Sequence, residues 1–265
     1  VFNYDNGIVS LVQYDLFNLD SNFPEDQTVK NELEALKPQL VTSYGNIFTQ
    51  IIATAPFNIG KTPSGTNPTL KDSPLGNLVA DALKQYAQAE IGITPNGFIA
   101  EGFYQGNITL FDILRSVPYG YDTASGLGFD VMTVDIQGKE LIKGLELGLN
   151  NIDNSDGYLL QVSGMRYKYD KTKPTGQRLI VPSVRVRNLP VSYTKFYRAG
   201  VSLGAVLFMQ ANGIEYKLIN QSTFEEYYAV KDLLNFIKQV KYYTEGRMKE
   251  VSTTPYLDNE EEYSP

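Results

Sequence analysis

The strongest hydrophobic pattern in the sequence lies between residues 73 and 87. Apolar side chains recur there at helical spacing and therefore share one face of a predicted helix. Ser73 followed by Pro74 is typical of an N-cap and the first helical residue. The apolar face consists of Leu75, Leu78, Val79, Ala82, Leu83, Tyr86 and Ala87. The sequence thus predicts a helix that begins at Pro74 and packs against a core.

Downstream of this helix, short apolar runs alternate with further helical patterns. Strands are predicted at 91–94, 129–136, 158–169, 178–187 and 195–201, and helices at 109–117, 138–149 and 223–243. The residues Lys173-Pro174-Thr175-Gly176 predict a turn between two of the strands. Because the helices and strands do not alternate strictly, we expect an α+β (mixed α/β) fold.

The N-terminal part of the chain has a more polar pattern. Residues 7–14 alternate between small or polar and apolar positions, which favours an extended segment. Pro24, Glu25 and Asp26 open a predicted helix that is only thinly apolar, so this helix is expected to bridge two units. The segment 56–72 is rich in Pro, Gly, Thr and Ser and is predicted to be a loop. At the other end of the chain, the acidic residues 258–262 predict a disordered tail.

Composition narrows the chemistry more than it narrows the fold. The 265 residues include no histidine and no cysteine. This chain acting alone therefore cannot form a Ser-His-Asp triad, a cysteine nucleophile, a thiolate metal site or a histidine-bearing dinuclear phosphoesterase centre. An enzyme that uses only carboxylates stays open, but no pair of acids stands out for that role.

Charge and hydropathy exclude two further classes of partner. The formal net charge is −7, which is unfavourable for binding a nucleic-acid backbone. No apolar run approaches the roughly 18 residues that a membrane span requires. We therefore expect neither nucleic-acid binding nor a membrane span, although a mononucleotide could bind at a local basic spot.

Several short motifs occur in the order of one known family. The segment Leu75–Ala82 reads LGNLVADA, and residues 96–97 read NG. Further motifs lie at 108–114, 117–120, 134–141, 160–165 and 245–248. Together they resemble the C-terminal substrate-binding domain of the 5′-nucleotidase family, over about residues 70–249. The resemblance implies a layered sandwich of mixed sheets and helices.

The resemblance also implies a domain organisation. Residues 1–22 would end an upstream metallophosphoesterase domain, 23–68 would form a linker helix and loop, 69–252 the C-terminal domain, and 253–265 an acidic tail. In that family the N-terminal domain binds two divalent metal ions, so no cofactor is expected in this chain. The implied partners are a nucleotide or nucleoside and the upstream domain, and the implied location is extracellular or periplasmic.

Within the resemblance, two tyrosines stand where the family has aromatic rings that stack a nucleobase. Tyr119, followed by Gly120, matches the first ring. The segment 211–216 resembles, with one deletion, the segment that ends in the second ring, which would make Tyr216 the partner of Tyr119. In a chain with 19 tyrosines, ordinary packing is the alternative for both.

The third site segment departs from the family pattern. Asn96 and Gly97 match the start of an Asn-Gly-Gly-Gly-Ile-Arg loop, although Asn-Gly is also a common turn dipeptide. The position of the family arginine is Glu101 here, and a second family arginine corresponds to Thr69. A carboxylate repels a phosphate that an arginine would bind. The site would then accept an altered substrate, or a nucleoside or sugar without phosphate, or it has been lost in a degenerate, non-catalytic secreted or surface binding module.

Overall fold

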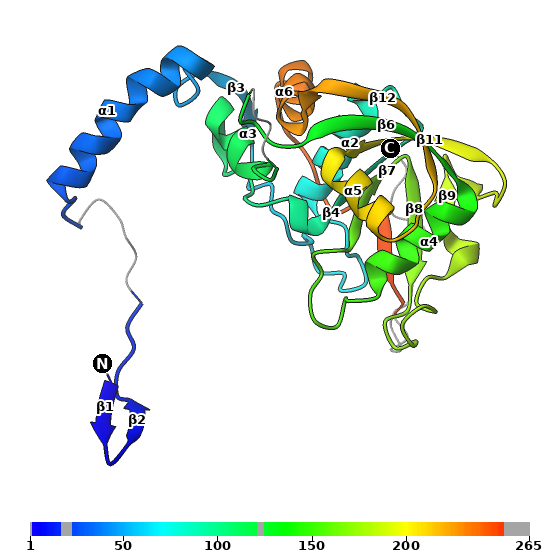
Figure 1. The fold of residues 1–265 in the computed structure, drawn as a ribbon, viewed down its shortest axis with the longest axis horizontal. Helices are drawn as coiled ribbons and strands as arrows, with labels where there is room; N and C mark the ends of the chain where they lie inside the picture. The colour runs from blue at the N-terminus through cyan, green and yellow to red at the C-terminus, as the bar shows by residue number, and fades with distance from the viewer. Residues whose placement is uncertain (1, 17–22, 121–124, 252–265) are drawn as a thin grey trace. The chain divides into compact units, whose positions relative to one another are not determined.

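The computed structural model describes residues 2–16, 23–120 and 125–251, which form two compact units, Val1–Asn46 and Ile47–Pro265. The first unit contains an antiparallel hairpin, β1 (Phe2–Asp5) and β2 (Ile8–Leu11), and the helix α1 (Gln27–Tyr44). Asp26 caps α1 by accepting hydrogen bonds from the backbone N–H groups of Thr28 and Val29. The predicted extended segment and the predicted polar helix are both confirmed (Figure 1).

The second unit is built on a five-stranded mixed sheet with the order β12-β6-β11-β4-β7 (Figure 1). Its strands are β4 (Ile91–Pro95), β6 (Asp130–Gln137), β7 (Leu160–Ser163), β11 (Phe196–Ser202) and β12 (Tyr216–Glu225). Only the β11–β4 pair is parallel; the other three pairs are antiparallel. This mixture of strand directions and interspersed helices confirms the α+β class.

The strand directions give this sheet two distinct ends. At one end the chain leaves β4, β11 and β12 and enters β6 and β7. We call this the Asn96 end; it comprises residues 96–98, 129, 157–159, 202–204 and 225–226. We call the opposite end the Gly164 end; it comprises residues 90, 137–138, 163–164, 195 and 216.

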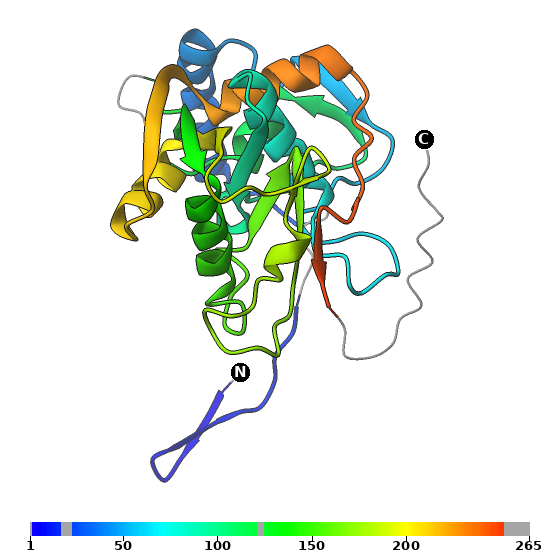
Figure 2. The same cartoon turned by 90° about the vertical axis from the view of Figure 1, so that its right-hand side faces the viewer.

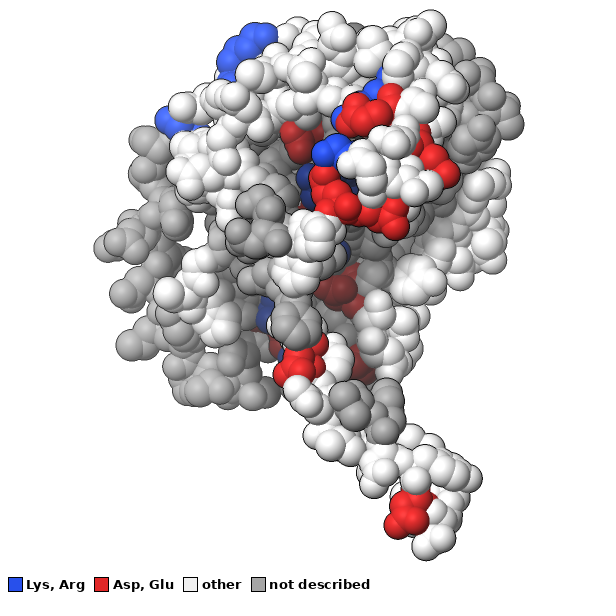
Figure 3. Space-filling model, turned by 90° about the vertical axis from the view of Figure 1, so that its left-hand side faces the viewer, with Lys and Arg blue, Asp and Glu red and all other residues white. Residues whose placement is uncertain are grey.

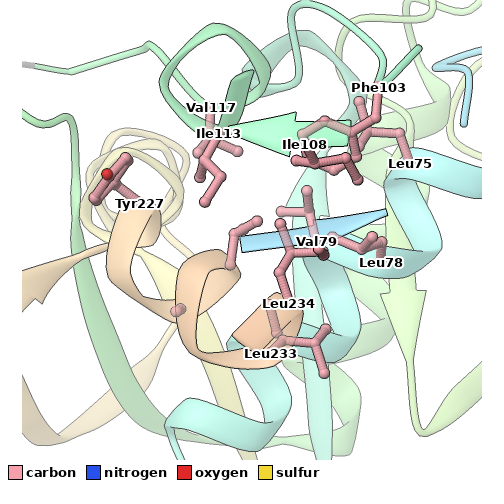
Figure 4. Close-up of a cluster of buried hydrophobic side chains, with 14 of the residues drawn as sticks. Leu75, Leu78, Val79, Phe103, Ile108, Ile113, Val117, Tyr227, Leu233 and Leu234 are labelled. Carbon is pink, nitrogen blue, oxygen red and sulfur yellow. The ribbon is translucent and has the colours of Figure 1, made fainter. Parts of the chain in front are cut away.

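Helices cover both faces of the sheet and enclose two buried apolar clusters. The first cluster joins α2 (Pro74–Tyr86), α3 (Leu110–Ser116) and α6 (Glu226–Ile237) with the small sheet of β3 (Ile51–Ala55) and β5 (Gly106–Thr109). Figure 4 shows the side chains of α2, α3 and α6 pointing toward one another. The second cluster includes α4 (Gly138–Leu149) and α5 (Leu203–Ala211). In Figure 2, α6 (orange) and α4 (green) lie on different sides of the unit.

Glycines let α2 lie directly on the sheet. A Cβ atom on Gly92 would stand 2.0 Å from the carbonyl oxygen of Ala80, and one on Gly200 would stand 2.3 Å from that of Leu83. Such contacts are shorter than any real Cβ contact, so only glycine fits at both strand positions. The predicted helix itself is confirmed in detail, since Ser73 is its N-cap and Pro74 its first residue.

A second, four-stranded sheet has the order β10-β9-β8-β13. Its strands are β8 (Met165–Tyr169), β9 (Arg185–Val186), β10 (Leu189–Pro190) and β13 (Met248–Glu250). The single strand expected at 158–169 is interrupted at Gly164, whose φ is +71°, so β7 and β8 belong to different sheets. Most of the strand expected at 178–187 is irregular, with a short 3₁₀ turn at Val181–Ser183 before β9.

The structure corrects one helix and adds elements that the pattern did not predict. The helix expected at 223–243 begins at Glu226, because the residues before it pair with β6, and ends at Ile237, where Lys238 has a φ of +58°. The sequence patterns did not predict β3, β5, α5 or β12.

The second unit begins earlier than the expected domain start at residue 69. Its core includes β3, which pairs with β5, and the fully buried Ile59. Residues 51–59 therefore contribute to the core of the second unit. Residues 17–22 of the expected upstream part and the expected tail at 253–265 lie outside the described residues.

None of the described helices combines the length and apolar character that crossing a bilayer requires. On the face drawn in Figure 3, acidic side chains gather in one area together with a few basic ones, in keeping with the net charge of −7.

Candidate functional site

Asn96 follows β4 directly and connects three segments of the Asn96 end. Its Nδ2 donates to Oδ2 of Asp156 at 2.9 Å, and its Oδ1 accepts from Nε2 of Gln161 at 3.3 Å. Gln161 in turn accepts, through Oε1, from the backbone N–H of Ser73 at 3.1 Å. Asn96 therefore joins the loop before β7 to the start of α2. The exposed Asp156 uses one of the two N–H donors of this amide group.

Gly97 brings two backbone segments into close contact. Its N–H donates to the carbonyl oxygen of Gly157 at 2.7 Å. A Cβ atom on Gly97 would lie 2.9 Å from that same oxygen. The approach of residue 157 thus favours glycine at this position, and the backbone of Gly97 is exposed.

Tyr119 and Gly120 lie in the loop between α3 and β6. The carbonyl oxygen of Tyr119 accepts from the backbone N–H of Phe129 at 3.1 Å, and its side chain is 45% exposed. Gly120 has a φ of +87°, and a Cβ there would lie 2.5 Å from the Phe129 ring. The Phe129 ring contacts Phe98, with centroids 5.3 Å apart. The structure therefore brings Tyr119 and Gly120 to the same end of the sheet as Asn96 and Gly97.

The Asn96 end also contains a stacked aromatic pair that the sequence patterns did not single out. The rings of Tyr158 and Phe208 have centroids 5.4 Å apart and an interplanar angle of 25°. Tyr158 directly follows Gly157 and is 47% exposed, and Phe208 belongs to α5. Because Tyr158 lies just before the motif at 160–165, the sequence could have indicated it as a site residue. No such indication existed for Phe208, because α5 was not predicted.

The structure does not bring Tyr216 to Tyr119. Tyr216 begins β12 opposite Ile136, near the far end of β6, and its hydroxyl accepts from Nε2 of Gln210 at 2.7 Å. The backbone of Tyr119 is bonded to Phe129, just before β6. At about 3.3 Å per residue, the length of β6 separates the two backbones by roughly 20 Å. Tyr216 packs at the Gly164 end because α5 carries the chain back along the sheet.

Glu101 lies next to groups of α3. Its backbone N–H donates to the carbonyl oxygen of Arg115 at 3.2 Å, and its Oε1 accepts from the hydroxyl of Tyr104 at 3.2 Å. The Arg115 guanidinium lies over the Tyr104 ring, 5.7 Å from its centroid, and also pairs with Asp112 at 3.5 Å. Arg115, a cation on α3, thus lies close to Glu101.

A buried carboxyl lies beneath the aromatic residues of this end. Glu226 is 1% exposed, and its backbone N–H donates to the carbonyl oxygen of Phe129 at 2.9 Å. Burial raises the pKa of Glu226 to about 8, and the neighbouring Ser202 hydroxyl offsets only part of this rise. Glu226 is therefore neutral at pH 7. The Asn96 end consequently offers exposed aromatic rings and backbone groups together with a buried carboxyl, Glu226, whose pKa burial raises.

The part of the chain that the structure describes contains no group of side chains suited to the two divalent ions that the resemblance implies. Across the described ranges there is no group of three or more Asp or Glu side chains placed to hold a metal ion, and the chain has no His or Cys. We derive no catalytic step through a metal on this chain.

Comparison with known proteins places these residues in a family context. The family model described as the 5′-nucleotidase C-terminal domain matches residues 51–205, more than half of the chain. Asn96, Gly97, Glu101 and the Tyr119–Gly120 pair lie inside the match. Tyr216 lies outside it.

Individual relatives agree with the family model. The trifunctional nucleotide phosphoesterase protein YfkN of Bacillus subtilis (strain 168) is 29% identical over 195 residues, which cover 68% of this chain and 12% of the relative. A snake venom 5′-nucleotidase of Macrovipera lebetinus is 28% identical over 199 residues, which cover 68% of this chain and 44% of the relative.

Solved structures give the same result. The 5′-nucleotidase precursor from Thermus thermophilus superposes with a TM-score of 0.72 and 25% identity, over 88% of this chain and 44% of that chain. This chain thus spans less than half the length of the relatives that it matches. With its order of motifs, its mixed sheet and a family match over residues 51–205, the chain belongs to the 5′-nucleotidase C-terminal domain family.

Proposed function

We propose that this chain holds the substrate of a 5′-nucleotidase-type, metal-dependent phosphoester hydrolase, and that it binds the base and sugar of a nucleoside or nucleotide at the Asn96 end. The observation that supports this most is that an exposed tyrosine, two glycines and a hydrogen-bonded asparagine lie at the same end of the sheet. The four residues are Tyr119, Gly97, Gly120 and Asn96. All of them fall within the family match.

Each group has a distinct part in the proposed binding. The exposed Tyr119 ring stacks on the base, which is worth about 1–3 kcal/mol per base. The close backbone approach at Gly97 leaves its exposed face free for the sugar. Because Glu101 stands where the family has an arginine, we expect adenosine to bind at least as tightly as AMP. Tyr216, at the other end of the sheet, takes no part.

Catalysis is assigned to a separate N-terminal domain. That domain supplies the two divalent metal ions, and this chain presents the substrate to it. The proposal is supported by relatives that are more than twice as long as the part that matches and that are named as phosphoesterases or nucleotidases. Since one relative is a venom protein, we place the whole protein in an extracellular or periplasmic compartment.

Calorimetry with adenosine and AMP tests the proposal on the chain as it stands. We expect Tyr119→Ala to weaken adenosine binding about tenfold, because it removes a stacking partner. The matched control Tyr216→Ala removes the same side chain from the Gly164 end and should leave the affinity within about twofold. Equal losses in both variants, or an unchanged affinity in Tyr119→Ala, would place the ligand elsewhere.

One observation favours a second candidate function, a binding module of this family that has lost nucleotide recognition. Glu101 puts a negative charge at the expected phosphate position, and the rings of Tyr158 and Phe208 already contact each other. Dissociation constants in the millimolar range or weaker for both adenosine and AMP would support this second function over the first.

A further inference from the structure

A basic cavity of about 390 Å³ opens at the Gly164 end of the sheet. Four cationic side chains line it: Lys84 from α2, Arg166 from β8, Arg185 from β9, and Arg187 from the turn after β9. Within the described part of the chain none of these four forms an ion pair. Such a concentration of positive charge is unexpected in a chain with a net charge of −7.

The two carboxylates that line the cavity, Asp81 and Glu245, are both bound by a fifth cation, Arg247. Its guanidinium donates to both oxygens of Asp81, at 2.7 and 3.0 Å, and its Nε donates to Glu245 at 2.9 Å. Burial alone would raise the pKa of Asp81, but Arg247 and then Ser163 hold it below its usual value. Arg247 thus binds both acids, and the cavity has five cationic side chains against two carboxylates.

The positions of Arg166 and Arg185 indicate that this group of cations lowers the stability of the protein when no ligand is bound. They are directly opposite each other on the antiparallel pair β8–β9. Like charges at directly opposed positions destabilise a sheet, by roughly 0.2–1 kcal/mol. An anion between the two guanidinium groups would turn this repulsion into attraction.

We propose that this cavity is a second binding site, for a phosphate-type oxyanion with at least two negative charges. Arginine guanidinium groups present donors in a fork that matches phosphate oxygens. The turn at Arg187 and Asn188, with φ values of 49° and 64°, is fixed by a 2.9 Å hydrogen bond from the Arg187 N–H to the carbonyl oxygen of Gly164. This bond holds Arg187 at the rim of the cavity, beside β7.

The site is separate from the proposed nucleoside site. Gly164 follows β7 at one end of the sheet, whereas Asn96 follows β4 at the other, and the two strands are antiparallel neighbours. A nucleoside at the Asn96 end therefore does not reach this cavity. The anion site consequently does not depend on the proposed function.

Titration calorimetry with inorganic pyrophosphate at fixed ionic strength tests this site. We expect the double substitution Arg166→Gln/Arg185→Gln to weaken binding about tenfold or more, because two charge-assisted contacts are lost. The control Lys61→Gln/Lys173→Gln removes the same charge from exposed positions outside the cavity. It should change the affinity by no more than about twofold. No binding by the unchanged protein, or equal weakening in both double variants, would overturn the proposal.

A single substitution keeps the test decisive if the double variant folds poorly. Arg187→Asn lies in an exposed turn, and asparagine tolerates its left-handed backbone conformation. We expect it to weaken pyrophosphate binding several-fold. An unchanged affinity in a folded Arg187→Asn protein would contradict the site.

Vesicle binding separates the two sources of such an oxyanion, a soluble phosphate and a lipid headgroup. Vesicles of phosphatidylcholine with phosphatidic acid are compared with vesicles of phosphatidylcholine alone. Binding to pyrophosphate without binding to vesicles assigns the site to a soluble phosphate. Vesicle binding that is lost in Arg166→Gln/Arg185→Gln assigns it to a headgroup, and binding to neither overturns the proposal.

Discussion

The two ends of the central sheet have opposite kinds of side chain beside them. The Asn96 end has exposed aromatic rings above a neutral buried carboxyl. The Gly164 end has a cluster of cations, with its buried carboxyl ionised and bound by arginine. Glu226 and Asp81 are both acids in poorly solvated positions, yet their pKa values shift in opposite directions. The difference teaches that burial raises the pKa of a carboxyl that has no cationic partner, and that a bound arginine overrides this effect of burial.

The largest expected effect comes from breaking the ion pair at the Gly164 end. Arg247→Met leaves Asp81 charged and without its bidentate partner, so we expect a loss of about 4 kcal/mol in the free energy of unfolding, measured by urea denaturation. Both side chains are largely shielded, at 14% and 21% exposure.

The control for this prediction is Arg198, an arginine of the central sheet whose side chain is exposed to solvent. Arg198 pairs with Asp135 at 3.0 Å, but its side chain is 46% exposed. Arg198→Met should therefore cost no more than about 1 kcal/mol. If Arg247→Met costs no more than Arg198→Met, Arg247 does not hold the Gly164 end together.

A pH titration of stability examines the carboxyl at the Asn96 end. The pKa of Glu226 is about 8 in the folded chain, against 4.5 for an unperturbed glutamate. The folded state thus binds one proton more than the unfolded state between these values. The stabilisation is present below about pH 4.5 and lost as the pH rises to about 8. We expect the loss of this stabilisation to lower the free energy of unfolding by roughly 3 kcal/mol between about pH 5 and pH 9.

Substitution of this residue provides the control. Glu226→Gln cannot ionise, so this part of the pH dependence should disappear, and the variant should be more stable than the unchanged protein at about pH 9. Parallel stability curves for the two proteins would show that Glu226 ionises in the fold at its ordinary pKa.

The smallest effect in this series contrasts one glycine from each end. Gly164→Ala places a Cβ 2.1 Å from the carbonyl oxygen of Glu90 at a φ of +71°, and we expect a loss of about 2 kcal/mol in thermal or urea unfolding. Gly97→Ala meets Gly157 at 2.9 Å in an exposed loop that can shift. It should cost less than about 1 kcal/mol but should weaken adenosine binding.

A further variant separates backbone strain from crowding. Gly176 also has a positive φ, of +85°, but nothing lies within 4 Å of an added Cβ. If Gly176→Ala costs as much as Gly164→Ala, the loss is conformational strain alone, and the close packing against Glu90 plays no part.

The first and the last of the motifs that indicated the family contact each other in the fold. Asp81 lies in the first motif and Arg247 in the last, and their ion pair joins α2 to the C-terminal segment. Asn77, also in the first motif, donates to the buried Asp72 at 2.7 Å and to the carbonyl oxygen of Tyr243 at 2.9 Å. Such contacts explain why these segments, far apart in sequence, are recognisable together.

By itself the sequence determined what local rules control. Hydrophobic spacing and an N-cap defined α2, composition removed histidine and cysteine chemistry, and ordered motifs identified the family. Tertiary structure decided what depends on long-range pairing. Strand pairing placed Tyr216 at the far end from Tyr119, turned residues 216–225 into β12, and set Arg166 opposite Arg185. No spacing along the chain specifies such neighbours, because strand pairing joins residues that are distant in sequence.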